Sequence, residues 1–285
     1  MPENGSKKNI LIFTGGGVKI AGTAIGVLKA LREYFISNDI TIDRVVGISG
    51  GAIVGGMHAL GYQTQTIAEI FESLWQPYLF KDFNRNPTKG ILKGALVETA
   101  LARAFQNKTF AETKIPFSAV ASIFKQRSPT PILLESGFLH EAVRASLSIP
   151  FLFEPKIMGG VRFYDGEMGV RDVFDILELI SEAHPATLET IYFVELDEQH
   201  SLSKNFSFAN IILKILKRRR VLGAQSNKKP FEKTDIIKIS IPILDRVPLW
   251  NMRDLPRFIM QGETVARFAL SKHYRSLNTE KAGPA

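Results

Sequence analysis

Two short apolar runs that end in glycines constrain what this chain can fold into more than any other feature. The run Ile10–Phe13 leads into Thr14 and three glycines, and the run Arg44–Ile48 leads into Ser49 and two glycines. Each is followed by a stretch that reads as a helix. A buried strand that turns at once into a helix is the repeating unit of a parallel sheet, because parallel strands need a crossover connection. The pattern therefore predicts an α/β fold with mostly parallel strands.

The rest of the chain alternates in the same way. The other strands are expected at residues 117–124, 132–135, 161–164, 190–196 and 235–241, and the helices at residues 20–35, 50–60, 64–75, 95–105 and 138–147. The segment Ser128–Pro131 has the composition of a turn between two of these strands. The sequence shows no repeat and no linker, so we expect one domain over residues 7–276, with loose termini at residues 1–6 and 277–285.

The composition excludes several classes of protein. The chain has no cysteine, which excludes a disulfide scaffold, a cysteine nucleophile and a thiolate metal site. The first nine residues are polar and charged, and the apolar run after them is too short for the core of a signal peptide. No stretch approaches the roughly 18 apolar residues of a membrane span. We therefore expect a soluble, cytoplasmic protein.

The basic charge lies in the last third of the chain. Residues 1–200 carry 19 basic and 22 acidic side chains, whereas residues 201–285 carry 17 and 6. Such a one-signed region predicts attraction to an anionic partner, either a phospholipid surface or nucleic acid. As a helix, residues 205–220 would have one apolar face with basic residues mainly off it, which is typical of a helix in a membrane interface. A core-packing helix with a solvated basic end would have the same pattern.

The first glycine loop, Gly15–Lys19, has the composition of an anion site. Three successive glycines let backbone N–H groups line a concavity at the start of a helix, where a phosphate or a developing oxyanion can bind. The phosphate-binding patterns do not match, because Ile20 stands where the Walker pattern needs serine or threonine and where the dinucleotide fingerprint needs glycine. A plain tight turn is the other interpretation.

The second glycine segment matches Gly-X-Ser-X-Gly, with Ser49 at its centre and Gly47 and Gly51 at its ends. This pattern places a serine on a sharp turn between a strand and a helix, where the glycines remove steric clashes. A serine nucleophile needs a base. Of the five histidines, His58 follows Ser49 by nine residues on the same expected helix and therefore points away from it. A partly desolvated carboxylate can serve instead, and Asp165 stands at the end of an expected strand, before Gly166.

These elements, in this order, resemble the patatin-like phospholipases. The glycine loop, the elbow around Ser49 and the Asp165-Gly166 pair match the motifs of that family, and so does Arg144-Ala-Ser-Leu-Ser-Ile-Pro150 before the aspartate strand. The resemblance covers about residues 9–170. It implies a three-layer fold with helices on both faces of the sheet, and a dyad of Ser49 and Asp165 without histidine. It also implies no metal or cofactor, and an oxyanion site at Gly15, Gly16, Gly17, Val18, Lys19 and Gly50.

Two positions depart from the family pattern. Ile20 stands where the family has a glycine after its basic residue, and the next glycine is Gly22. Glu167 stands where the family has glycine or alanine after Asp-Gly, so a second carboxylate lies near Asp165. The implied substrate is a phospholipid or another fatty-acyl ester, taken from an anionic membrane at which the protein is peripheral, so a lipid surface is favoured over nucleic acid.

Two other functions remain open from the sequence. An acyltransferase of the malonyl-transfer type also has a serine elbow, but it needs a histidine base and an arginine for a carboxylated acyl group. A non-catalytic module could hold a phosphate in the glycine loop and nucleic acid on its basic region. A histidine near Ser49 in the fold would favour the acyltransferase.

Overall fold

The structure, a computed structural model, describes residues 7–74, 79, 81–86, 89–126, 128–197, 229–242 and 254–282. The strands are β1 (Lys8–Phe13), β2 (Arg44–Ile48), β3 (Phe117–Lys125), β4 (Ser128–Leu134), β5 (Lys156–Met158), β6 (Val161–Asp165), β7 (Leu188–Asp197) and β8 (Asp235–Pro242). The α-helices are α1 (Gly17–Ser37), α2 (Gly50–Ala59), α3 (Thr64–Leu74), α4 (Ala95–Ala104), α5 (Leu139–Ser146), α6 (Val173–Ala183) and α8 (Leu255–Ala282). Short 3-10 helices are η3 (Phe110–Glu112), η4 (Gly166–Met168) and η5 (Lys229–Phe231).

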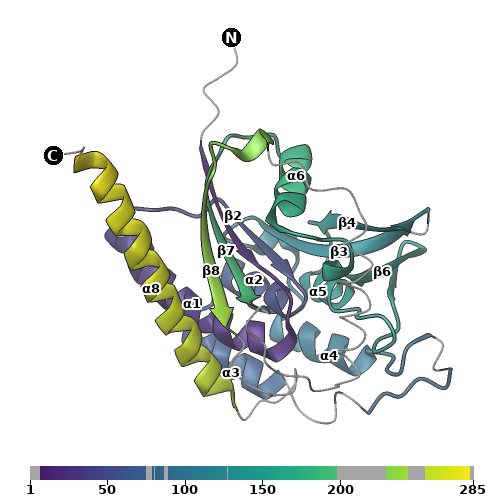
Figure 1. Ribbon diagram of the computed structural model, residues 1–285. Helices are drawn as coiled ribbons and strands as arrows, with labels where there is room; N and C mark the ends of the chain where they lie inside the picture. The colour runs from purple at the N-terminus through teal and green to yellow at the C-terminus, as the bar shows by residue number, and fades with distance from the viewer. Residues whose placement is uncertain are drawn as a thin grey trace.

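The strands form one sheet, with β1 between β2 and β7 (Figure 1). The order is β5-β6-β3-β2-β1-β7-β8, and β4 pairs with β3 alone among the described strands. The pairs β3–β2, β2–β1, β1–β7 and β7–β8 are parallel, whereas β4, β5 and β6 are antiparallel to their neighbours. Because the chain turns back across β1 to reach β7, the carboxyl end of β1 is the switch point where ligands bind in such sheets.

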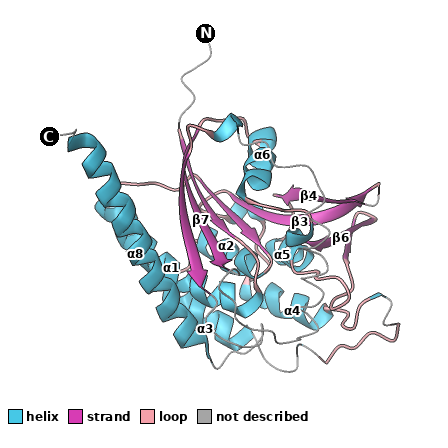
Figure 2. Cartoon of the chain, in the orientation of Figure 1, coloured by secondary structure: helices cyan, strands magenta, loops and turns pink. Residues whose placement is uncertain are grey.

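Helices cover both faces of the sheet, as Figure 2 shows. The larger core lies between the sheet and a layer that includes α1, α2, α3 and α8. The smaller core packs β-strand side chains such as Ile12 and Val46 against Val173, Ile176 and Leu177 of α6. The predicted three-layer α/β fold with a mostly parallel sheet is therefore confirmed. Of the helices in the described part of the chain, none is both long and apolar enough to span a bilayer.

The expected turn Ser128–Pro131 is wrong, because these residues begin β4. Pro129 and Pro131 lie opposite Phe124 and Ser122 of β3. A strand with only one neighbour tolerates proline, since the missing N–H groups can face its open edge.

Helices α6 and α8 were not predicted, and α8 continues through residues 277–282, which we expected to be a loose end. The expected helix at residues 205–220 lies outside the described residues.

Helices α1 and α8 lie side by side, in contact through glycines (Figure 1). A Cβ placed on Gly26 of α1 would lie 1.9 Å from the carbonyl oxygen of Ile259. On the other helix, a Cβ on Gly262 would lie 2.0 Å from the carbonyl oxygen of Thr23. The two backbones therefore approach more closely than any side chain allows, and this contact fixes α8 against the sheet.

The substitution Gly26→Ala should destabilise the protein by about 2 kcal/mol or more, because the added methyl group must push α8 away from α1. The matched control is Gly55→Ala in α2, where the nearest atom to a Cβ would be 3.2 Å away. There, helix propensity offsets the tighter packing, so we expect little change. Chemical denaturation measures both free energies of unfolding. Equal values for the two variants would contradict the close helix contact.

Candidate active site

The glycine loop follows β1 at the switch point and starts α1. Gly16 has φ 145° and Gly17 has φ 63°, so both require conformations that favour glycine. The loop is packed from outside by β7, because a Cβ on Gly16 would lie 2.5 Å from Cδ1 of Leu196. The amide of Thr14 also donates to the carbonyl oxygen of Val194 in β7. The loop is therefore held against the carboxyl end of the sheet.

Ser49 lies between β2 and α2 in a strained conformation. Its φ of 51° and ψ of −122° are unusual for a residue with a side chain, and only 3% of its surface is exposed. The flanking glycines make this turn possible, because a Cβ on Gly47 would lie 2.5 Å from Cα of Ala52, and one on Gly51 2.4 Å from the carbonyl oxygen of Thr14. A buried serine on a strained turn before a helix has the form of a nucleophile elbow.

Asp165 ends β6 and is also buried, with 3% of its surface exposed. Its Oδ1 accepts a hydrogen bond of 2.9 Å from the amide of Glu167, which caps the 3-10 helix η4. Its own amide donates to the carbonyl oxygen of Ser148 at 2.9 Å. The aspartate is therefore held from both sides by backbone groups.

The register of β3 brings Ser49 and Asp165 to one place. Val120 of β3 pairs with Ile48 at the end of β2, and the next residue, Ala121, pairs with Asp165 at the end of β6. Because β2 is parallel and β6 antiparallel to β3, the two strands arrive from opposite directions and end at adjacent positions. A Cβ on Gly166 would lie 2.9 Å from Cγ2 of Ile48, so the two segments are in contact.

The glycine loop lies against the elbow from the other side. A Cβ on Gly50 would lie 2.3 Å from the carbonyl oxygen of Gly17 and 2.9 Å from Cγ2 of Ile20. Ile20, the departure from the family pattern, is therefore buried between loop and elbow. Gly22 does not replace the missing loop glycine, because it faces Phe258 of α8. Lys19 is 9% exposed in the first turn of α1, which excludes a solvated surface lysine.

Glu167, the second departure, connects the aspartate segment to the glycine loop. Its Oε1 accepts a hydrogen bond of 2.9 Å from the amide of Gly15. Its side chain lies on the Cα of Gly15, where a Cβ would be 2.7 Å from Cγ and Cδ of Glu167. The carboxylate of Glu167 is therefore not free in solvent, because it accepts a hydrogen bond from the first amide of the glycine loop.

Two serines that the sequence analysis did not single out support the site. The amide of Ser49 donates to Oγ of Ser146 at 2.8 Å, and Ser146 donates to the carbonyl oxygen of Val120 at 2.6 Å. Ser148 supplies the carbonyl oxygen that holds Asp165, and its Oγ accepts from Arg144 at 2.7 Å. Both belong to the Arg144–Pro150 motif, whose match to the family was the available signal.

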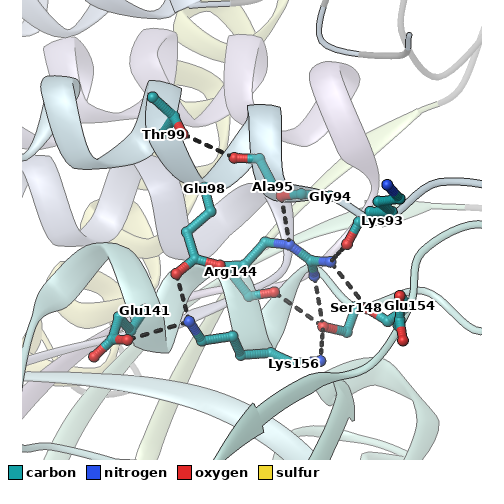
Figure 3. Close-up of polar contacts among 10 residues, drawn as sticks. All are labelled: Lys93, Gly94, Ala95, Glu98, Thr99, Glu141, Arg144, Ser148, Glu154 and Lys156. Atoms are coloured by element: carbon teal, nitrogen blue, oxygen red, sulfur yellow. Dashed lines mark hydrogen bonds and ion pairs between the residues drawn. The ribbon is translucent and has the colours of Figure 1, made fainter. Parts of the chain in front are cut away.

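Arg144 itself is a buried clamp, 2% exposed (Figure 3). Its guanidinium donates to the carbonyl oxygens of Lys93, Gly94 and Glu154, at 2.9 to 3.1 Å. It also lies over the ring of Phe153, 5.0 Å from the centroid. Burial lowers the pKa of Arg144 to about 10, so it stays charged at neutral pH. The clamp joins residues 93–94 and 153–154 to the helix that carries Ser146.

The described histidines have other partners or lie away from Ser49. His58 lies two and a half turns into α2, about 13 Å along the axis from Ser49. His184 contacts Glu135 at 2.8 Å, and His273 lies 3.2 Å from Asp235. His140 packs against Phe138. His200 lies outside the described residues, so the structure pairs Ser49 with no histidine in the part of the chain that it describes.

The arrangement suits nucleophilic catalysis. It brings together a buried serine hydroxyl, a buried carboxylate and the start of two helices, where backbone N–H groups are free of helical partners. Such N–H groups stabilise the negative charge that develops on a carbonyl oxygen under attack. The amides of Gly15 and Ser49 have other partners, which leaves those of Gly16, Gly17, Val18 and Gly50 as candidate donors.

In a comparison with known proteins, one family model covers all of these motifs. The family model described as Patatin-like phospholipase matches residues 11–180, which include the glycine loop, the elbow and Asp165. An uncharacterized NTE family protein of Mycobacterium tuberculosis is 29% identical over 163 residues, 56% of this chain and 43% of that protein. The lysophospholipase NTE1 of Debaryomyces hansenii is 25% identical over 181 residues, 61% of this chain and 11% of that protein. The chain thus spans less than half the length of these curated relatives.

Solved structures with a similar fold are less similar in sequence. VipD from Legionella pneumophila has a TM-score of 0.50 and 13% identity, covering 94% of this chain and 67% of that chain. Human GIVD cytosolic phospholipase A2 has a TM-score of 0.50 and 9% identity, covering 98% and 63%. At these identities the likeness concerns the fold alone.

The burial of His58 predicts a loss of stability in acid. Burial lowers the pKa of His58 to about 4 from its ordinary value of 6.5. Between these values the unfolded chain binds a proton that the folded chain does not, so the free energy of unfolding should fall by up to about 3 kcal/mol as pH drops from 6.5 to 4. Denaturation as a function of pH measures this, and His58→Asn should flatten the curve. An unchanged curve in His58→Asn would assign the acid sensitivity to other groups.

Proposed function

The chain belongs to the patatin-like phospholipase family, and from that premise we propose that it hydrolyses fatty-acyl esters of lipids through Ser49 and Asp165. One observation carries the proposal. The strands that bear these two residues end at adjacent positions of β3, with the glycine loop packed against the elbow. Serine, carboxylate and oxyanion donors thus converge at the switch point of the sheet, where α/β folds bind ligands.

In the proposed reaction, Asp165 accepts the proton of the Ser49 hydroxyl while Oγ of Ser49 attacks the acyl carbonyl carbon. The carbonyl oxygen becomes an oxyanion that accepts hydrogen bonds from the amides of Gly16, Gly17, Val18 and Gly50. Each such donor contributes about 3–4 kcal/mol in enzymes of acyl transfer. The tetrahedral intermediate expels the alcohol, which takes the proton from Asp165. Water, deprotonated by Asp165, then releases the fatty acid from Ser49.

The strain at Ser49 fits this role. Its positive φ directs the hydroxyl away from the regular path of strand and helix, at a conformational cost of order 1–3 kcal/mol. The hydrogen bond from its amide to Ser146 helps to hold that conformation, since Ser146 is fixed in turn on Val120. The serine is thus oriented before any substrate binds, which lowers the entropic part of the barrier.

Two observations favour hydrolysis over transfer of a carboxylated acyl group. Such a transferase needs a histidine base and an arginine for its carboxylated acyl group, but the described histidines lie elsewhere and Arg144, in the motif before the aspartate strand, is engaged with backbone carbonyl oxygens. We propose a phospholipid or lysophospholipid as substrate, met by a protein that is peripheral at the membrane. A non-catalytic anion-binding module is the outcome if no ester is cleaved.

The substitutions Ser49→Ala and Asp165→Asn should each lower kcat by about 10³-fold or more, and the double variant should be little worse than either, because nucleophile and base act as one unit. Asparagine can still accept the hydrogen bond from the amide of Glu167, so Asp165→Asn tests the base rather than the fold. The assay is release of a chromogen from a short-chain acyl ester, with the exposed Ser73→Ala as control. Near-normal turnover of Asp165→Asn would assign the base to another residue.

The contact of Glu167 with Gly15 predicts a split between two variants. Glu167→Gln keeps an acceptor for the Gly15 amide and should retain kcat within about threefold. Glu167→Ala removes it, and the loosened loop should lower kcat by about 10- to 100-fold with little change in KM, since displacements of about 1 Å cost this much. Steady-state kinetics on the same ester measures both constants. If glutamine behaves like alanine, the charge of Glu167 matters rather than its hydrogen bond.

A further inference from the structure

The described residues 81–86 and 89–94 belong to a loop that projects from the molecule beyond α4 (Figure 1). Phe83 pairs with Leu92 across the loop, and Leu92 pairs in turn with Phe153. The amides of Ile91 and Leu92 donate to the carbonyl oxygens of Phe151 and Leu152, at 2.9 and 2.8 Å. The described part of the loop and the segment 151–153 therefore form one small, braced unit.

Two phenylalanines of this unit are exposed to solvent. Phe83 is 65% exposed and Phe151 is 61% exposed, although neighbouring Leu92 and Phe153 are buried. Phe151 also has φ 66°, a conformation that bulky residues rarely adopt. An aromatic side chain that is both exposed and held in a strained conformation is unfavourable for the isolated protein. Strained positions of this kind cluster at functional sites.

Four cationic residues belong to the same loop as Phe83. Lys81, Arg85, Lys89 and Lys93 are all exposed, and none has an ion pair within the described residues. The one acid among residues 81–94 is Asp82, whose Oδ2 accepts a hydrogen bond from the amide of Leu96. The loop thus presents unpaired positive charge beside exposed aromatic rings. This combination suits a surface that is both anionic and apolar.

The loop is also tied to the proposed site. Arg144 binds the carbonyl oxygens of Lys93 and Gly94 at the base of the loop and that of Glu154 after Phe153. Two positions after Arg144, the hydroxyl of Ser146 accepts from the amide of Ser49, and four positions after it, the carbonyl oxygen of Ser148 accepts from the amide of Asp165. The base of the loop is therefore connected to the proposed nucleophile through Arg144 and Ser146.

We propose that Lys81, Phe83, Arg85, Lys89, Lys93 and Phe151 form a docking surface for anionic phospholipid membranes. The rings enter the interface and the cations contact the headgroups. The proposal rests on the proposed function, in that it explains how a lipid hydrolase meets its substrate, and it involves other residues than the basic region at 205–220. A projecting loop with four unpaired cations and exposed aromatic rings complements the anionic, apolar interface of a bilayer.

The test measures partition into vesicles by sedimentation, with Ser49→Ala throughout so that no lipid is consumed. Vesicles of phosphatidylcholine with phosphatidylglycerol should bind the protein, more weakly as salt rises, and pure phosphatidylcholine should bind it far less.

Replacing Lys81, Arg85, Lys89 and Lys93 by glutamine should lower the partition coefficient by roughly 100-fold at low salt. Phe83→Ser with Phe151→Ser should lower it at least about tenfold. The matched charge control replaces the exposed Lys114, Lys125, Lys233 and Lys272 by glutamine and should retain most of the binding.

A second measurement locates the contact. Because the chain has no cysteine, Phe83→Cys, Phe151→Cys and Phe268→Cys each accept one environment-sensitive fluorophore. Phe268 lies on α8 and is 71% exposed, which makes it the matched control. Anionic vesicles should shift the emission to shorter wavelength at positions 83 and 151 and leave it unchanged at 268. Melting temperatures confirm that each variant folds.

Several results would overturn the proposal. These are unchanged partition in the quadruple glutamine variant, no emission shift at position 83 or 151, or binding to polyglutamate without binding to vesicles, which would indicate an acidic protein partner. The readouts are independent of catalysis. A protein that docks through this loop but cleaves no ester would refute the proposed function alone, and one that cleaves soluble esters but docks elsewhere would refute the docking surface alone.

Discussion

The approach of one backbone to another at the carboxyl edge of the sheet is the constraint on which the rest of the structure depends. Gly50 lies against the backbone of Gly17, Gly51 against that of Thr14, and Gly166 against that of Val120. At each of these contacts a single methyl group would collide with main-chain atoms. Two helix starts and two strand ends can therefore share one small volume, and the strained turn at Ser49 is held within it.

The parts of this arrangement that lie close in sequence could be predicted. Glycines beside short apolar runs identified β1, β2, the loop and the elbow, because turns that need glycine leave a local signal. The contacts of Ser146 with Ser49 and of Glu167 with Gly15 could not be predicted, because the paired residues lie 97 and 152 positions apart in the sequence. Helix α8 was missed for a similar reason: its place depends on Gly262 meeting α1, which no local pattern reveals.

The buried guanidinium of Arg144 connects the projecting loop to the segment that supports Ser49 and Asp165. A buried charge is tolerated only when hydrogen bonds replace its lost water, and here backbone carbonyl oxygens from separate segments do so. Because those carbonyl groups belong to the projecting loop and to residue 154, the loop is not an independent appendage. Arg144 thus links the base of the loop to α5 and, through Ser146, to the elbow.

The two prolines of β4 limit how this sheet can grow. Pro129 and Pro131 lie opposite Phe124 and Ser122 of β3 but carry no N–H group, and β4 has no second neighbour among the described strands. An incoming strand from another chain would find alternate donors missing along this side and could not form a continuous ladder. The sheet thus ends at β4 because the prolines lack hydrogen-bond donors, rather than because another element covers this edge. Edge-to-edge pairing with another sheet, the usual hazard of an open edge, is therefore disfavoured along β4.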